Sequence, residues 1–118
     1  MLIETFDDLH KAYPENRDNM SEETEREFVS HCYRLYKNEG FSKIFWTPYE
    51  DQCEHIGKSF VVVKELWDYK YMELECLPIW LIRFDTGEEI QAYAEEIIPS
   101  EMKKFGCNFT EDGEVNLN

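Results

Sequence analysis

The sequence predicts one α+β domain, in which N-terminal helices pack on a small curled antiparallel β-sheet or barrel. Apolar residues recur at helical spacing up to Gly40 and follow an extended pattern from Phe41 onward. The length of 118 residues fits a single domain, and 8 Phe, 7 Tyr and 3 Trp residues can build its core. We expect helices over residues 1–40, strands over 41–98, and a short helical turn with a polar tail over 99–118.

Two helices are predicted before Gly40. The first runs from Glu4 to Tyr13, where Pro14 ends an amphipathic pattern formed by Phe6, Leu9, His10 and Tyr13. The second follows Ser21, a favourable N-cap, and the pair Thr24 and Glu27 offers another capping box one turn later. It ends at Asn38-Glu39-Gly40, and its apolar face holds Phe28, Val29, Cys32, Leu35 and Tyr36.

Five short strands are predicted next, at residues 41–46, 60–63, 71–76, 79–84 and 89–93. The β-branched run Val61-Val62-Val63 predicts a well-buried second strand. Trp80, Ile82 and Phe84 should share one face of the fourth strand. Asp85-Thr86-Gly87 then suits a hairpin loop with a positive φ at the glycine. A helical turn is expected over Pro99–Lys104, and a polar tail over Thr110–Asn118.

The order of these β segments resembles the Src-homology-3-like barrel. The resemblance covers about Ile56 to Ile98 and comprises Gly57–Val63, a long loop from Trp67 to Pro78, Trp80–Phe84, Gly87, and Glu89–Ile98. It implies a small barrel that serves protein interaction. Peptide-binding members of that family offer acidic and aromatic residues in the long loop, and Trp67-Asp68-Tyr69-Lys70-Tyr71 contains both types.

The net charge of −14 limits the classes of partner. With 26 acidic and 12 basic residues, the chain should repel nucleic-acid phosphates and anionic membranes. The same field favours rapid association with basic grooves, including those in which nucleic-acid enzymes hold DNA or RNA. The competing interpretation is that the charge only supplies solubility. Residues 1–8 lack the pattern of a secretory signal, so a cytosolic location is expected.

Cysteine and histidine residues predict a structural zinc site. In a reducing compartment thiols are more often free or metal-bound than paired. Zinc takes four nitrogen or sulfur ligands in tetrahedral array. The predicted ligands come from the second helix, the following loop and the C-terminal segment: Cys32, Cys53, His55 and Cys107, with His31 as a substitute for Cys32. The alternative is that Cys32 and Cys76 are core residues and that Cys53 and Cys107 are surface thiols.

No motif for an enzyme is present. The sequence contains no phosphate-binding glycine-rich loop, no Gly-x-Ser-x-Gly elbow and no His-Glu-x-x-His helix. Pairs such as Glu88-Glu89 and Glu95-Glu96 are expected from the acidic composition alone. We therefore predict a protein that is not an enzyme and propose no catalytic residue.

Two groups of residues are predicted to bind a protein partner. One is an acidic stretch without an intervening base after Asp85, and the other is a group of loop aromatics, a type enriched in binding hot spots. Their members are Asp85, Glu88, Glu89, Glu95, Glu96, Trp67, Tyr69 and Tyr71. The alternative interpretations are a solvated acidic face and aromatics that pack over the end of a barrel.

In overall profile the chain resembles phage-encoded anti-defence inhibitors, including anti-CRISPR proteins and DNA mimics. The shared features are small size, acidity, a single domain and the absence of enzyme motifs. The resemblance implies an inhibitor in the host bacterial cytosol that binds a basic surface of a nucleic-acid enzyme, first of all an RNA-guided CRISPR nuclease, and blocks DNA binding. The alternatives are an adaptor module with a barrel fold and a small metal-dependent enzyme.

Overall fold

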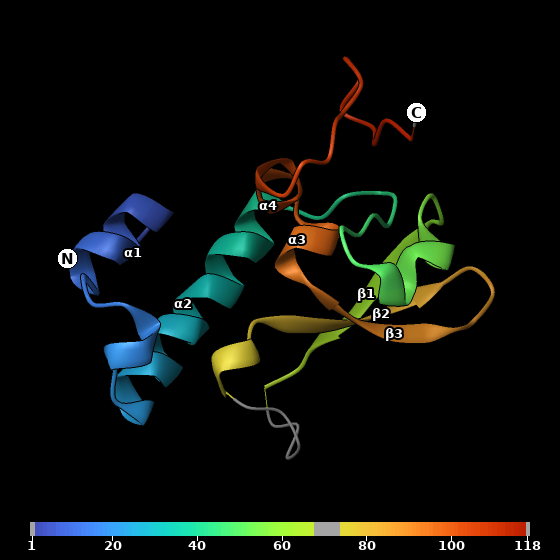
Figure 1. Cartoon of the computed structure of the whole chain (residues 1–118). Coiled ribbons are helices and arrows are strands. Elements are labelled where there is room, and N and C mark those ends of the chain that lie inside the picture. Colours follow the sequence, from blue (N-terminus) through green and yellow to red (C-terminus); the bar gives the residue numbers. More distant parts are fainter. Residues whose placement is uncertain (1, 68–73, 118) are drawn as a thin grey trace.

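The computed structural model describes residues 2–67 and 74–117 and has the α+β architecture that the sequence predicts (Figure 1). The helices are α1 (Phe6–Ala12), α2 (Glu22–Glu39), α3 (Ala94–Ile97) and α4 (Pro99–Lys104). The strands are β1 (Phe60–Glu65), β2 (Ile79–Phe84) and β3 (Glu89–Tyr93). Three short 3₁₀ helices connect them: η1 (Arg17–Asn19), η2 (Glu50–His55) and η3 (Leu74–Cys76).

The two predicted N-terminal helices are confirmed, and their caps explain where they begin. Thr5 caps α1 in a capping box with Asp8, whose carboxylate accepts the backbone N–H groups of Glu4 and Thr5. These backbone N–H groups, that of Glu4 foremost, lower the pKa of Asp8. Ser21 caps α2 by accepting from the Thr24 N–H at 3.1 Å, and Gly40 ends this helix with a φ of 92°.

The sheet is open, antiparallel and ordered β1-β2-β3. Trp80, Ile82 and Phe84 are buried on one face of β2, as their spacing predicts. The β2–β3 turn has a φ of 91° at Gly87, the positive value expected there. Of the two predicted forms, sheet or barrel, the described strands form a sheet.

Several predicted strands were wrong in detail. Residues 41–46 contribute only a bridge between Ile44 and Ser59, because backbone N–H groups of this segment bond to scattered carbonyls of residues 58, 96 and 97. Leu74–Cys76 forms η3 instead of a strand, and the first part of the predicted strand, 71–73, lies outside the described residues. The predicted β region also ends earlier, since Ala94–Ile97 is helical.

Strand β1 is not well buried, contrary to the prediction from its three valines. Val61 and Val63 are 58% and 39% exposed. The strand lies at an edge of the sheet, and only its other face packs on the core, so alternate residues meet water. A bulge between Val62 and Lys64 interrupts its pairing with β2, as is common on edge strands.

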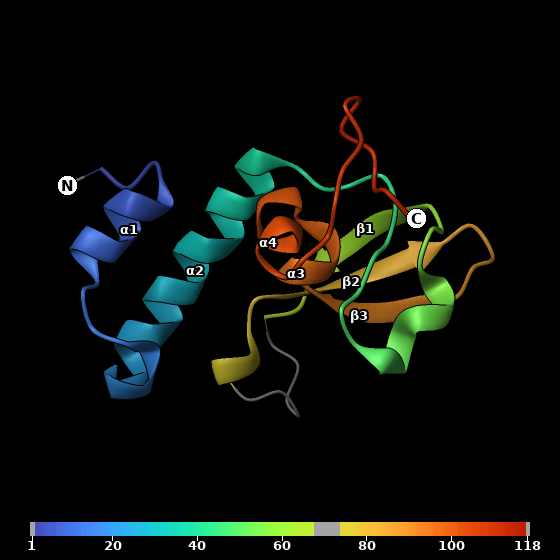
Figure 2. The ribbon, with the colours of Figure 1, turned by 45° about the horizontal axis from the view of Figure 1, so that its top comes forward.

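Helix α2 lies between α1 and the sheet (Figures 1 and 2). The junction with the sheet centres on Trp80, which is 1% exposed and meets the rings of Tyr33, Tyr36 and Phe41 edge-on.

A second, smaller core forms around Met102, Cys107 and Val115. The predicted polar tail therefore contributes an apolar residue to packing. None of the helices in the described part of the chain is long and apolar enough to cross a membrane.

Candidate functional site

A groove lies on the outer face of the sheet. It lies between Pro48–Gln52, β2, β3 and the start of α3, and it has a volume of 1220 Å³. Strand pairing sets its floor, because Ile79 lies opposite Tyr93 and Leu81 lies opposite Gln91 on neighbouring strands. We call it the acidic groove after its lining, which comprises Pro48, Tyr49, Glu50, Asp51, Gln52, Ile79, Leu81, Glu89, Ile90, Gln91, Tyr93, Glu95 and Glu96.

Five of these lining residues are acidic, and none of the described lining residues is Lys or Arg. Among the described residues, Glu89 alone of the five has a Lys or Arg partner, since its carboxylate lies 2.7 Å from the guanidinium of Arg83. Glu50 and Asp51 are exposed and have no ion pair among the described residues. The carboxylates of Glu50 and Asp51 are therefore open to positively charged groups of a partner.

Glu95 and Glu96 are neighbours with different roles. Glu95 accepts a hydrogen bond of 2.6 Å from the Tyr49 hydroxyl, and this bond is the main reason that the pKa of Tyr49 rises to about 12. Glu96 is 2% exposed and accepts from the Tyr93 N–H at 2.9 Å at the start of α3. Burial raises the pKa of Glu96. The prediction that Glu96 offers a surface charge is wrong, because its side chain holds the β3–α3 corner.

The other predicted acidic residues separate into two places. Glu89 and Glu95 line the groove. Asp85 is exposed in the β2–β3 turn, and Glu88 contacts His55 at 3.2 Å. The acidic stretch thus contributes partly to the groove and partly to a neighbouring polar contact.

The predicted aromatic loop is only partly described. Trp67 is half-buried and lies against the Tyr33 ring with centroids 4.8 Å apart, so it packs on the main core. The alternative interpretation expected packing over the end of a barrel, but the described strands form an open sheet. Tyr69 and Tyr71 lie outside the described residues.

The predicted zinc ligands lie in different surroundings. Cys32 is in the main core, Cys107 is in the smaller core, and Cys53 is exposed on η2. Burial raises the pKa of Cys32 to about 12, which opposes the thiolate form that binds metal. In the described part of the chain, no three His, Cys, Asp or Glu side chains are grouped to hold a metal ion. The alternative interpretation placed Cys32 and Cys76 in the core and Cys53 and Cys107 at the surface. It was right for Cys32, which is buried, and for Cys53, which is exposed. It was wrong for Cys76, which is exposed, and for Cys107, which is buried.

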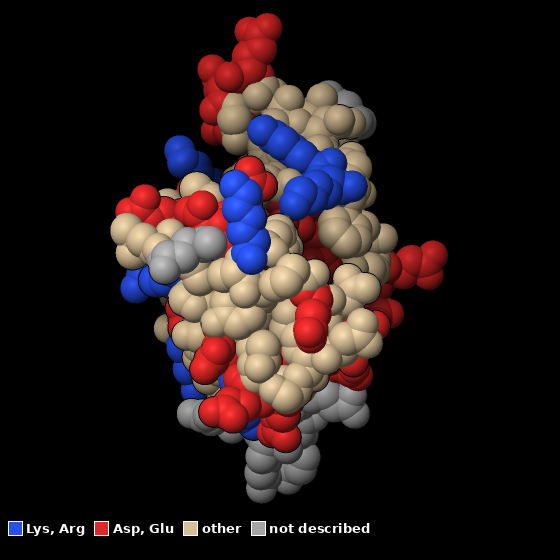
Figure 3. Space-filling model, turned by 90° about the vertical axis from the view of Figure 1, so that its left-hand side faces the viewer, with Lys and Arg blue, Asp and Glu red and all other residues tan. Residues whose placement is uncertain are grey.

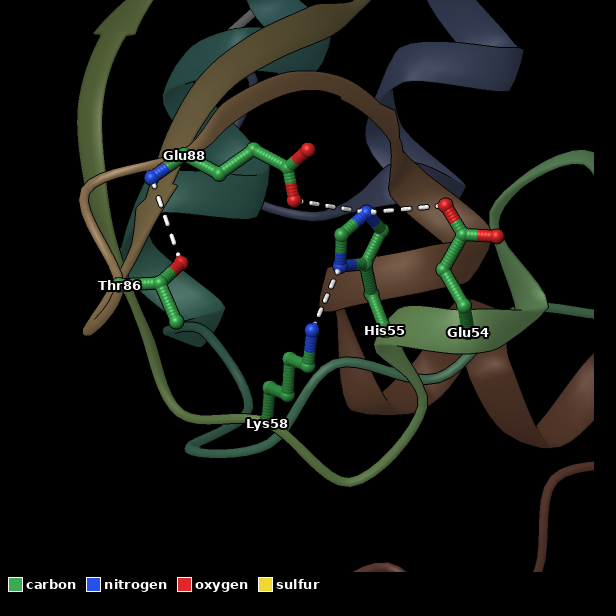
Figure 4. Close-up of polar contacts among 5 residues, drawn as sticks. All are labelled: Glu54, His55, Lys58, Thr86 and Glu88. Atoms are coloured by element: carbon green, nitrogen blue, oxygen red, sulfur yellow. Dashed lines mark hydrogen bonds and ion pairs between the residues drawn. The ribbon is translucent and has the colours of Figure 1, made fainter.

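The two histidines considered as ligands already have protein partners. His31 lies 2.9 Å from Arg34. His55 is 3% exposed and stacks on Phe84, with ring centroids 4.5 Å apart. Its Nε2 faces the carboxylates of Glu88 at 3.2 Å and Glu54 at 3.6 Å, while its Nδ1 faces the Lys58 ammonium at 3.2 Å (Figure 4).

The charge is unevenly distributed over the protein. Figure 3 shows the side that carries α1, where the centre is largely uncharged, Lys and Arg gather in the upper part, and Asp and Glu lie mostly around the edges. The groove, by contrast, combines carboxylates with exposed aromatic rings. Its concave shape and its charge make it the candidate site.

Sequence reasoning missed ten of the thirteen groove residues, among them the polar and aromatic residues Tyr49, Glu50, Asp51 and Tyr93. The alternation of β3 offers a signal for Tyr93, because residues 89, 91 and 93 must share a face. No such signal exists for Tyr49 to Asp51, whose position depends on how η2 packs beside the sheet.

Comparisons with known proteins give no further guidance: no protein family, curated protein or solved structure matches this chain. Function must be argued from the site itself.

Proposed function

We propose that this protein is a non-enzymatic inhibitor that uses its acidic groove to bind a basic surface of a nucleic-acid enzyme and thereby blocks DNA binding. An RNA-guided CRISPR nuclease is the first enzyme class to test. The observation that carries the proposal is the groove lining, with four exposed or half-buried carboxylates, Glu50, Asp51, Glu89 and Glu95, and no described Lys or Arg.

Charge complementarity supports this class of partner. Enzymes that act on DNA or RNA hold phosphates with clustered Lys and Arg, and carboxylates in a concave surface can pair with the same cations. A net charge of −14 also attracts a basic partner over a distance comparable to the Debye length, about 8 Å at physiological ionic strength. Charge of this kind mainly increases the association rate.

Two matched charge reversals test whether the groove is the binding surface. Glu50→Lys with Asp51→Lys changes the groove, whereas Glu111→Lys with Asp112→Lys changes the exposed tail by the same net charge. Each variant is used to capture partners from a bacterial lysate, and captured nucleases are then assayed for DNA binding and cleavage. We expect the groove pair to slow association roughly tenfold or more at low salt and the tail pair to have a much smaller effect.

Equal effects of the two pairs would contradict the groove as the binding surface. Capture of only acidic or neutral partners, or a complex that still binds and cleaves DNA normally, would favour an adaptor instead of an inhibitor.

Structural zinc is a separate proposal, which rests on the sequence alone. Elemental analysis of protein purified without chelator or affinity-tag metal should find about one zinc ion per chain if the four ligands assemble. Cys53→Ser should then reduce the zinc content, whereas Cys76→Ser, at an exposed cysteine outside the predicted set, should not. Metal-free protein with unchanged stability would contradict the proposal.

A further inference from the structure

Two tyrosine rings form an exposed aromatic pair in the acidic groove. Tyr49 is the N-cap residue of η2 and Tyr93 ends β3, and these residues are 41% and 40% exposed. Their ring centroids are 6.3 Å apart, with an interplanar angle of 73°. Two large rings that stay half open on a folded surface are typical of binding sites, where Tyr is enriched.

The groups around this pair accept hydrogen bonds and carry negative charge. The Tyr49 hydroxyl donates its proton to Glu95, so its oxygen presents lone pairs to the groove. Glu95 is half-buried, and Glu50 and Asp51 are exposed on the same side. A ligand that suits this place must donate hydrogen bonds, carry positive charge and present a flat or apolar surface to the rings.

We propose that the acidic groove binds an exposed arginine side chain of the partner at the Tyr49–Tyr93 pair. The guanidinium group stacks on aromatic rings and donates up to five hydrogen bonds in a planar fork, which suits the nearby carboxylates. A lysine ammonium carries the same charge but neither stacks nor forms a fork. This inference rests on the proposed function, because it specifies the chemistry of the partner at the same groove.

The size of the groove indicates that the arginine belongs to a longer segment. Its 1220 Å³ exceeds the roughly 300–1,000 Å³ typical of small-molecule pockets. The floor contains Leu81, which is half-buried and can contact apolar atoms beside the arginine. An extended peptide segment of a basic protein surface therefore fits better than a free amino acid.

Titration of the full chain with capped peptides tests the proposal. The probe is a glycine-rich hexapeptide with one arginine, compared with identical peptides that carry lysine or uncharged citrulline. We expect backbone amide shifts in NMR spectra to centre on Tyr49, Gln91 and Tyr93, with the arginine peptide binding most tightly. Tyr93→Leu should weaken binding roughly five- to thirtyfold, because it keeps an apolar side chain but removes the ring, whereas Tyr93→Phe should bind nearly as wild type.

Phe105→Leu is the matched control, since Phe105 is 48% exposed at the end of α4, outside the groove lining. Near-ultraviolet circular dichroism establishes that each variant is folded. Equal affinity for arginine and citrulline, shifts centred outside the groove, or the absence of binding would each overturn the arginine proposal. If the protein nevertheless captures a nuclease and the Glu50 and Asp51 reversals weaken that capture, the proposed function stands without it.

Discussion

His55 is a polar residue whose ring packs in the core. The imidazole stacks on Phe84, and its two nitrogens face Lys58 and Glu88 at the edge of the core (Figure 4). An ammonium group can only donate, so Nδ1 accepts from Lys58 and the proton of the neutral ring belongs on Nε2, toward Glu88. Both partners are exposed and can regain water if the histidine is replaced.

Two substitutions of His55 separate ring packing from polar contacts. His55→Ala should lower the free energy of unfolding by about 2–4 kcal/mol, because it leaves a cavity beside Phe84 and Phe45. His55→Phe should cost less than half as much, because a ring remains. Urea unfolding measures both values. If both variants lost the same unfolding free energy, the contribution of His55 would come from its polar contacts or from a bound metal and not from ring packing.

Glu96 makes a specific contribution to pH dependence. Burial raises its pKa above the ordinary value of 4.5, so the folded chain holds this proton at pH values where the unfolded chain has lost it. Its contribution to stability therefore falls as pH rises from about 4.5 through the raised pKa, and is constant above that.

Glu96→Gln should remove this pH dependence while its side-chain oxygen can still accept from the Tyr93 N–H. The stability of the wild type relative to the variant should decrease from pH 4 to pH 7, as measured by urea unfolding at each pH. Glu111→Gln, at an exposed tail position, is the control. A relative stability that increases with pH would contradict the raised pKa.

At the level of elements, Tyr33 joins α2 to the sheet. Its hydroxyl lies 3.2 Å from the Leu66 carbonyl and 3.1 Å from the Ile79 carbonyl, and it accepts from the Ile79 N–H at 3.0 Å. One side chain thus satisfies backbone groups just after β1 and at the start of β2. The apolar pattern of α2 does not indicate this role, because Tyr33 lies beside the predicted stripe.

Tyr33→Phe should lower the free energy of unfolding by about 1–3 kcal/mol, because it leaves the buried Ile79 N–H without its acceptor. Tyr13→Phe is the control, since the Tyr13 hydroxyl bonds to Glu27 in a contact exposed to water. Thermal unfolding measures both. A loss no larger than that of the control would show that the hydroxyl does not stabilise the helix–sheet junction.

On the scale of the whole molecule, charge opposes folding. A net charge of −14 on 118 residues makes the compact state repel itself, and the ion pairs between Lys or Arg and Asp or Glu that the described residues form are partly or largely exposed. Added salt screens both effects, and the excess of acids makes the repulsion the larger one.

We expect the melting temperature to rise by a few °C between about 0.01 M and 0.3 M sodium chloride, over which the Debye length falls from about 30 Å to less than 8 Å. Glu50→Gln with Asp51→Asn, which removes two groove charges, should show a smaller rise and a higher melting temperature at low salt. A melting temperature that falls with salt would show that ion pairs outweigh the repulsion.

Local periodicity was enough to predict α1, α2, β2, β3 and α4, because each is set by spacing, caps and turn residues that lie close in sequence. The order of charged residues likewise identified the acidic stretch that contributes Glu89 and Glu95 to the groove. Neither signal was sufficient for the rest. They could not show that Glu96 is buried, that residues 41–46 leave the sheet, or that Tyr49 meets Tyr93. Those features depend on contacts between segments far apart in the chain, and only the packing of η2 and α3 beside the sheet brings them together.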